Sequence, residues 1–125
     1  MRLILTFLIL TFMPIGAALA DGDPAAGEKV YKQFCKRCHE PIPGDPLAAP
    51  SLKGIVDRPI ADAEDYRYSD AFLAKKAEGM IWDEQNLRDF MRHPRGFIPG
   101  SVMVFTGVKR AQHRDDLFAY LKGLK

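Results

Sequence analysis

The pentapeptide "CKRCH", Cys35 to His39, contains the only two cysteines of the 125-residue chain. Two residues separate the cysteines, and a histidine follows the second one directly. This arrangement can serve in a thiol–disulfide centre, in a metal site or in the attachment of a cofactor. Each of these uses needs different surroundings, so the rest of the sequence decides between them.

The surroundings of the two cysteines disfavour two of these uses. A thioredoxin-like redox centre needs a βαβ context, and the chain has no convincing strand pattern. A structural zinc ion usually takes four ligands, whereas Cys35, Cys38 and His39 supply three, and His93 and His113 lie far along the chain. In an exported chain the pattern favours covalent attachment of haem. Cysteines three apart on a helical turn point to one side, so both can bond to the vinyl edge of a haem while the histidine reaches the iron.

Export is predicted by the first 20 residues, "MRLILTFLILTFMPIGAALA". Arg2 precedes an apolar run over residues 3–13, and residues 18–20 form a small-x-small cleavage site. This pattern is typical of a secretory signal peptide. The apolar run is marginally long enough for an uncleaved anchor, but the proline and glycine that follow it, ahead of the cleavage site, favour removal. We therefore expect a mature chain that starts at Asp21.

Charge and size narrow the function further. The chain has 18 Lys and Arg against 16 Asp and Glu, and removal of residues 1–20 takes away Arg2 alone. The resulting charge of about +1 gives no global basic field of the kind that nucleic-acid-binding domains carry. Residues 21–125 form one small domain with a limited core of its own. A single disulfide across so short a loop would stabilise it little, so we expect a cofactor to fill the centre.

The predicted elements are helices joined by long loops, which makes the fold class all-α. Asp23 as N-cap and Pro24 at the first helical position begin a helix that continues to Cys35. Residues 40–68 form a loop of a length that is unusual in a compact domain unless it wraps a non-protein group. The other expected helices are one capped by Ser69 that runs through Ala77, one capped by Asp83 with Pro94 as its stop, and one that opens at Arg114 or Asp115. Residues 95–109 are expected to be irregular.

Five ordered segments resemble the class I cytochromes c, the soluble type that includes mitochondrial cytochrome c and the bacterial cytochromes c2. The resemblance covers nearly all of residues 22–122 and implies the cytochrome c fold, with several helices and long loops wrapped around one covalently bound haem. The matching segments are "GDPAAGEKVYKQFCKRCHE" for the first helix and haem site, "APSLKGIVDR" for the proline loop, "YRYSDAF" for the tyrosine segment, "IWDEQNLRDFMRHPRGFIPGSVMVFTGVK" for the methionine loop and its preceding helix, and "RDDLFAYLK" for the last helix.

The resemblance implies His39 as the fifth iron ligand and Met103, in "IPGSVM", as the sixth. A thioether is a soft neutral ligand, and His/Met ligation raises the reduction potential of haem iron. The alternatives for the sixth position are Met80, Met91 and His93. The two methionines fit core positions near helices, and the histidine fits a surface position at a helix end.

Further residues around the haem follow from the same resemblance. The carbonyl of Pro50 resembles the one that accepts the ring N–H of the haem histidine, which fixes its tautomer. Tyr68 and Trp82 resemble donors to a haem propionate, with Arg58 nearby, and Ser101 resembles a hydroxyl residue that also contacts a propionate.

The sequence also departs from the family pattern. Phe90 stands where mitochondrial members have a tyrosine whose hydroxyl reaches the methionine sulfur, and Ala61 and Asp65 replace loop glycines. Several positions that carry lysine around the haem edge in the family are neutral here, while others stay basic. Phe34, Gly96 and Val102 are the neutral positions, and Arg95, Lys109 and Arg110 are the basic ones.

The sequence therefore predicts a soluble, monomeric, one-electron carrier of the bacterial periplasm, with one haem c and no enzymatic activity. Its expected partners are redox proteins such as a membrane cytochrome complex, an oxidase or a reaction centre. Nucleic acid and stable membrane insertion after signal cleavage are not expected. The alternatives are a dedicated subunit or electron acceptor of one periplasmic dehydrogenase, and a haem enzyme or gas sensor with an open iron position.

Overall fold

A computed structural model describes residues 22–40 and 49–125, and the expected signal peptide 1–20 lies outside these ranges. The described part holds six helices and, apart from an isolated antiparallel bridge between Pro59 and Ile81, no strand pairing. The predicted all-α class is confirmed. No helix within the described ranges has the length and apolar content required to cross a bilayer. The helices are α1 (Pro24–Phe34), α2 (Lys36–His39), α3 (Asp70–Ala77), α4 (Glu84–Arg92), α5 (Pro94–Phe97) and α6 (Ala111–Gly123).

Helix α1 begins and ends where the sequence predicts. The carboxylate of Asp23 accepts a hydrogen bond of 2.8 Å from the backbone N–H of Ala25, and Pro24 occupies the first helical position. The apolar spacing buries one face of the helix, at Val30 and Tyr31. Because α1 ends at Phe34 and α2 follows immediately, the CKRCH segment is held on a rigid helical support.

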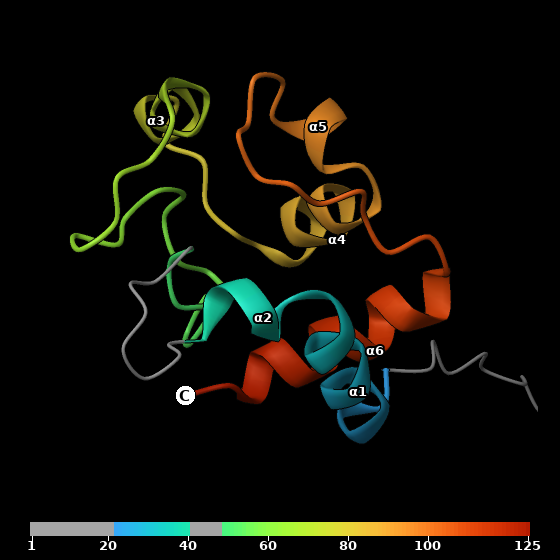
Figure 1. The fold of residues 1–125 in the computed structure, drawn as a ribbon. Helices are drawn as coiled ribbons and strands as arrows, with labels where there is room; N and C mark the ends of the chain where they lie inside the picture. The colour runs from blue at the N-terminus through green and yellow to red at the C-terminus, as the bar shows by residue number, and fades with distance from the viewer. Residues whose placement is uncertain (1–21, 41–48) are drawn as a thin grey trace, which may run out of the picture.

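The crossing of α1 and α6 is the most extensive contact between helices (Figure 1). A β-carbon at Gly27 would lie 1.9 Å from the carbonyl oxygen of Asp116 and 2.8 Å from the β-carbon of Tyr120. The rings of Tyr31 and Tyr120 pack beside this point, with centroids 5.2 Å apart. The two helices can approach this closely only because residue 27 has no side chain.

Helix α6 begins at Ala111, so the expected start at Arg114 or Asp115 is wrong. Two aspartates at and just after the expected start make tertiary contacts instead. Asp115 forms an ion pair with Arg88 of α4. Asp116 is buried, and its carboxylate accepts a hydrogen bond of 2.9 Å from the backbone N–H of Asp23. These contacts attach α6 to α4 and to the start of α1.

Helix α4 follows its prediction, while the segment after it does not. The carboxylate of Asp83 accepts a hydrogen bond of 2.8 Å from the N–H of Asn86, and the helix buries Leu87, Phe90 and Met91. Pro94 was expected only as a stop, but it also opens the one-turn helix α5 within a stretch predicted to be irregular. Proline suits the first position of a helix because its missing N–H has no intrahelical partner there.

In the loop before α3, a residue other than glycine adopts the left-handed backbone conformation. Ala61 has φ +58° and is buried, a conformation that costs an L-residue about 1–2 kcal/mol. Backbone hydrogen bonds hold the loop against the segment after α3: the N–H of Ile60 donates to Met80 at 3.0 Å, and that of Trp82 donates to Arg58 at 2.8 Å. The replacement of the family glycine at 61 is therefore tolerated by pairing of the neighbouring backbone.

The helices fall into two groups. In Figure 1, α1, α2 and α6 lie together on one side, and α3, α4 and α5 lie on the other, with loops running between them. Among the helices of residues 22–40 and 49–125, only α4 bridges the two groups through helix–helix contacts, with α6. The space between the groups is where the site lies.

Replacement of Gly27 with Ala tests the close crossing of α1 and α6. The added methyl group overlaps the backbone of α6, so we expect the free energy of unfolding of the holoprotein to fall by about 1–3 kcal/mol. The measurement is denaturant unfolding followed by circular dichroism. Gly123→Ala in the same helix pair is the control, because no atom lies within 4 Å of its added β-carbon. Equal stability of the two variants would contradict the account of the crossing.

Candidate functional site

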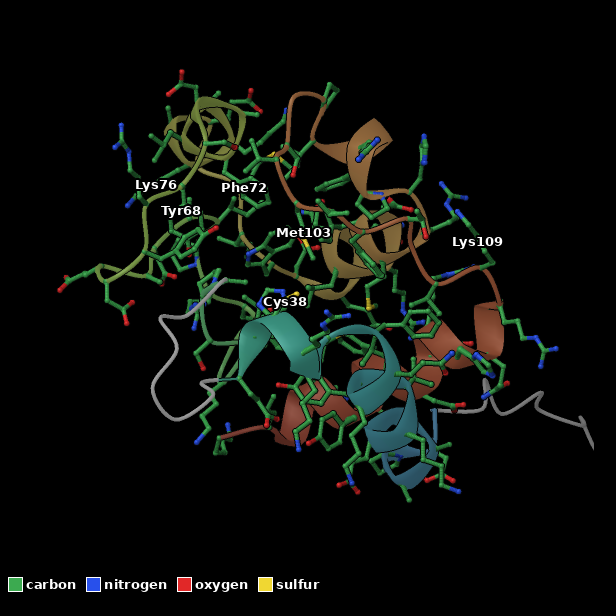
Figure 2. The ribbon with its side chains drawn as sticks, viewed as in Figure 1. Cys38, Tyr68, Phe72, Lys76, Met103 and Lys109 are labelled. Atoms are coloured by element: carbon green, nitrogen blue, oxygen red, sulfur yellow. The ribbon has the colours of Figure 1, made fainter. Side chains whose placement is uncertain are left out.

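A cavity of about 410 Å³ occupies the centre of the domain. Side chains of α1 to α4, of α6 and of the loops line it. Cys35, Cys38 and His39 of CKRCH line the same cavity as Met103, and Figure 2 shows two of them, Cys38 and Met103. Protein interiors ordinarily contain few voids larger than a water molecule, so a cavity of this size indicates a ligand site. Its apolar walls include Leu52, Ile55, Phe72, Leu87, Phe90 and Leu117.

Both cysteines line the cavity as free thiols, Cys38 on α2 and Cys35 at the junction of α1 and α2. Burial, with a smaller effect from Cys38, raises the pKa of the Cys35 thiol to about 12. A redox-active CxxC motif works through a thiol whose pKa is lowered. The environment of Cys35 therefore disfavours a thiol–disulfide centre and suits two thiols held side by side for attachment.

His39 is buried against the cavity with its ring orientation fixed. Its Nδ1 lies 2.6 Å from the carbonyl oxygen of Pro50, and because a carbonyl can only accept, Nδ1 carries the hydrogen. Burial lowers the pKa of His39, and the bond to Pro50 opposes this in part. The ring is neutral at pH 7 and keeps the lone pair of Nε2 for a metal ion.

Of the four candidates for the opposite iron ligand, two line the cavity. Met103 does so from the loop before α6, and Met91 does so from within the core face of α4. Met80 and His93 do not line it, and the histidine is exposed on the surface. Figure 2 shows Cys38 and Met103 turned into the same central space from opposite sides.

Three of the residues expected beside a propionate, Tyr68, Trp82 and Arg58, line the cavity. The Tyr68 hydroxyl accepts a hydrogen bond of 3.4 Å from the N–H of Ala63. Because burial raises the pKa of Tyr68, the hydroxyl keeps its hydrogen, which stays available to an acceptor. The Arg58 Nε lies 2.8 Å from a carboxylate oxygen of Asp62. Its terminal nitrogens donate to the carbonyls of residues 53 and 51 at 2.9 and 3.2 Å. Arg58 thus contributes charge at the cavity wall while protein groups hold it in place.

Ser101 and Ser69 make contacts that differ from those predicted for them. The Ser101 hydroxyl accepts a hydrogen bond of 3.2 Å from the N–H of Met103, and Ser101 is not part of the cavity lining. Ser69 is predicted only as the N-cap of α3, but its side chain makes no capping hydrogen bond and lines the cavity. Its hydroxyl is buried without a hydrogen-bond partner in the described structure. The only sequence signal for this residue was its position next to Tyr68.

These residues fit a haem. Two thiols and a neutral imidazole come from one short segment, a thioether comes from a second segment, and the walls between them are apolar. The hydroxyls of Tyr68 and Ser69 are suited to the carboxylates of a propionate edge, because an unpartnered buried hydroxyl is costly until an acceptor satisfies it. The fold and the site together define a helical protein that carries covalently attached haem.

Known proteins agree with this class. The sequence model of the family described as Cytochrome c matches residues 24–125. Cytochrome c-554 of Methylosinus trichosporium is 42% identical over 107 residues, which cover 85% of this chain and 78% of that protein. Cytochrome c of Theileria annulata is 41% identical over 103 residues, covering 82% and 86% respectively. The chain belongs to the cytochrome c family, class I, and is a haem c electron carrier.

The change in unfolding free energy of a Ser69→Ala variant tests whether the Ser69 hydroxyl donates a hydrogen bond to the haem. If a haem carboxylate accepts from it, Ser69→Ala should lower the free energy of unfolding of the holoprotein by about 1–3 kcal/mol, as for loss of a charged hydrogen bond. Ser69→Thr keeps the hydroxyl and is the control. A Ser69→Ala holoprotein that unfolds at higher denaturant concentration than the wild type would mean that the hydroxyl stays unpartnered.

Proposed function

We propose that this protein shuttles one electron at a time between redox proteins of the bacterial periplasm, with His39 and Met103 as the two axial ligands of its haem iron. The observation that carries the proposal is the neutral, buried His39 and the Met103 thioether lining one apolar cavity. The haem, when bound, supplies an iron that takes up and releases one electron. His39 and Met103 would both hold the iron and leave no ligand position for a substrate, so the chain would act as a carrier and not as an enzyme.

The residues of the chain have distinct parts in this function. Cys35 and Cys38 hold the haem covalently, and the bond from His39 to Pro50 keeps the imidazole in one tautomer and one orientation. Apolar side chains around the cavity exclude water, which limits the reorganisation that accompanies a change of charge. A soft Met103 thioether raises the potential relative to a harder ligand.

The carboxylates of the haem are assigned to one wall of the cavity. Tyr68, Trp82 and Ser69 supply the neutral donors there, and Arg58 supplies positive charge. The Ser101 hydroxyl accepts a hydrogen bond from the backbone of Met103, and this contact would help to hold the loop that carries the expected ligand. A contact of Ser101 with a propionate remains the expectation from the family resemblance.

The cellular setting of the proposal rests on the first residues of the chain and on a relative. Residues 1–20 have the pattern of a secretory signal peptide, and a bacterial cytochrome c-554 is among the similar proteins. We therefore assign residues 21–125 to one monohaem domain that acts as a monomer in the periplasm. Its partners are a membrane cytochrome complex, an oxidase or a reaction centre, and a dehydrogenase that it serves as subunit or acceptor is the second candidate.

Methionine ligation is tested by opening the sixth position. Met103→Ala should lower the reduction potential, make the reduced iron bind carbon monoxide and change the visible spectrum, because the thioether no longer occupies the iron. Met80→Leu is the control, since this methionine does not line the cavity. The measurements are potentiometry and spectra with and without carbon monoxide. Unchanged spectra in Met103→Ala, or carbon monoxide binding to the wild type, would contradict the proposed ligation.

A further inference from the structure

Asp62 is a charged residue close to the cavity that has no part in the function proposed above. Its carboxylate lies 2.8 Å from the Nε of Arg58, and both side chains are partly buried, with 28% of Asp62 and 24% of Arg58 exposed. Water therefore screens this ion pair less than it screens a pair on the open surface. Arg58 lines the cavity, whereas Asp62 does not. The pair thus joins a cation of the cavity wall to a carboxylate outside the lining.

The backbone on both sides of Asp62 is anchored. The carbonyl of Ala61 accepts a hydrogen bond of 3.2 Å from the Lys76 ammonium of α3, and the N–H of Ala63 donates to the Tyr68 hydroxyl at 3.4 Å. Ala61 itself adopts the left-handed conformation, with φ +58°. The place of the Asp62 carboxylate is therefore set by a turn that is held at both ends, and one of these contacts is with a residue of the cavity wall.

The guanidinium of Arg58 has donors left for one more partner. One terminal nitrogen donates to the carbonyl of residue 53 and the other donates to that of residue 51. Three of the five N–H donors of an arginine then remain. One of them is on Nε, which is buried and has no hydrogen-bond partner within the described residues, so its contact with Asp62 is an ion pair alone. A haem carboxylate at this wall is the other anion that the guanidinium can take, which makes Asp62 its competitor.

The charges of Arg58 and Asp62 both act on the cavity wall. Burial has the largest effect on the pKa of Tyr68 and raises it, and of the two neighbouring charges Arg58 lowers this pKa while Asp62 raises it. The carboxylate thus offsets part of the positive charge that the guanidinium brings to the wall. Each reduction brings one electron from the donor to the iron, so the charge at the centre falls by one. A positive charge at the wall favours this change, and a negative charge opposes it.

We propose that Asp62 is a positioning residue that lowers the reduction potential of the haem, because it holds Arg58 against the protein and offsets its charge. The inference rests on the proposed electron-carrier function and adds a residue that sets its driving force. Without the Asp62 carboxylate, the guanidinium is free to neutralise a haem carboxylate, and its positive charge is no longer opposed. Both consequences favour the reduced protein, so they act with the same sign.

Potentiometry of Asp62→Asn tests this proposal. At a fixed solution potential we expect the ratio of reduced to oxidised protein to rise about threefold over the wild type, a modest effect because water partly screens the pair. Asp62→Glu keeps the charge and should retain the wild-type ratio. Glu78→Gln is the matched control, because it also removes a carboxylate from an ion pair, with Lys75 at 2.9 Å, and neither of these residues lines the cavity. The control should leave the ratio unchanged.

A double-mutant comparison separates action through Arg58 from the effect of charge alone. Arg58→Gln by itself should lower the ratio, and in that background Asp62→Asn should raise it much less than in the wild type, because no guanidinium is left to release. An unchanged or lower ratio in Asp62→Asn, an equal rise in Glu78→Gln, or a full rise in the absence of Arg58 would overturn the proposal. Failure of the carrier function would appear in the wild type instead, as the absence of a reversible one-electron couple.

Discussion

Many of the side chains that form the hydrophobic core of this domain also face a common cavity. The helices lie in two groups around about 410 Å³ of space, and the loops that join them follow its wall. A chain of this size has little apolar surface with which to stabilise itself, so its stability depends on filling that space. A haem is a large apolar plate, and burial contributes roughly 25 cal/mol per Å² of apolar surface. We therefore infer that the central constraint is the filling of this cavity by the cofactor, which would complete the core.

The rest of the structure positions the groups that hold this cofactor. The missing side chain at Gly27 lets α1 approach α6, and the buried carboxylate of Asp116 fixes the start of α1. Because α1 continues directly into α2, this crossing sets the place of Cys38 and His39, and the carbonyl of Pro50 then orients the imidazole. The loop before α6 then brings Met103, the expected second iron ligand, to the same cavity.

Most of the fold and much of the site could be predicted from the sequence, and the failures have physical causes. The helix start at Asp23 and the inward face of α4 follow from local capping and periodicity. The start of α6 was placed too late because an aspartate that caps a helix and one that makes a tertiary ion pair look alike in sequence, as Asp115 illustrates. The free hydroxyl of Ser69 was missed because local sequence says which residue precedes a helix but not which way its side chain points.

Circular dichroism of the chain without attached haem tests the role of the cofactor as core most directly. In Cys35→Ala with Cys38→Ala, freed of any loosely held haem, the loops have nothing to wrap, and a cofactor that binds only the folded chain no longer adds its binding energy to folding. If the cofactor serves as the core, this variant loses most of the helical signal and cooperative unfolding that the wild-type holoprotein shows. Full helix content with a cooperative transition in the haem-free variant would contradict it.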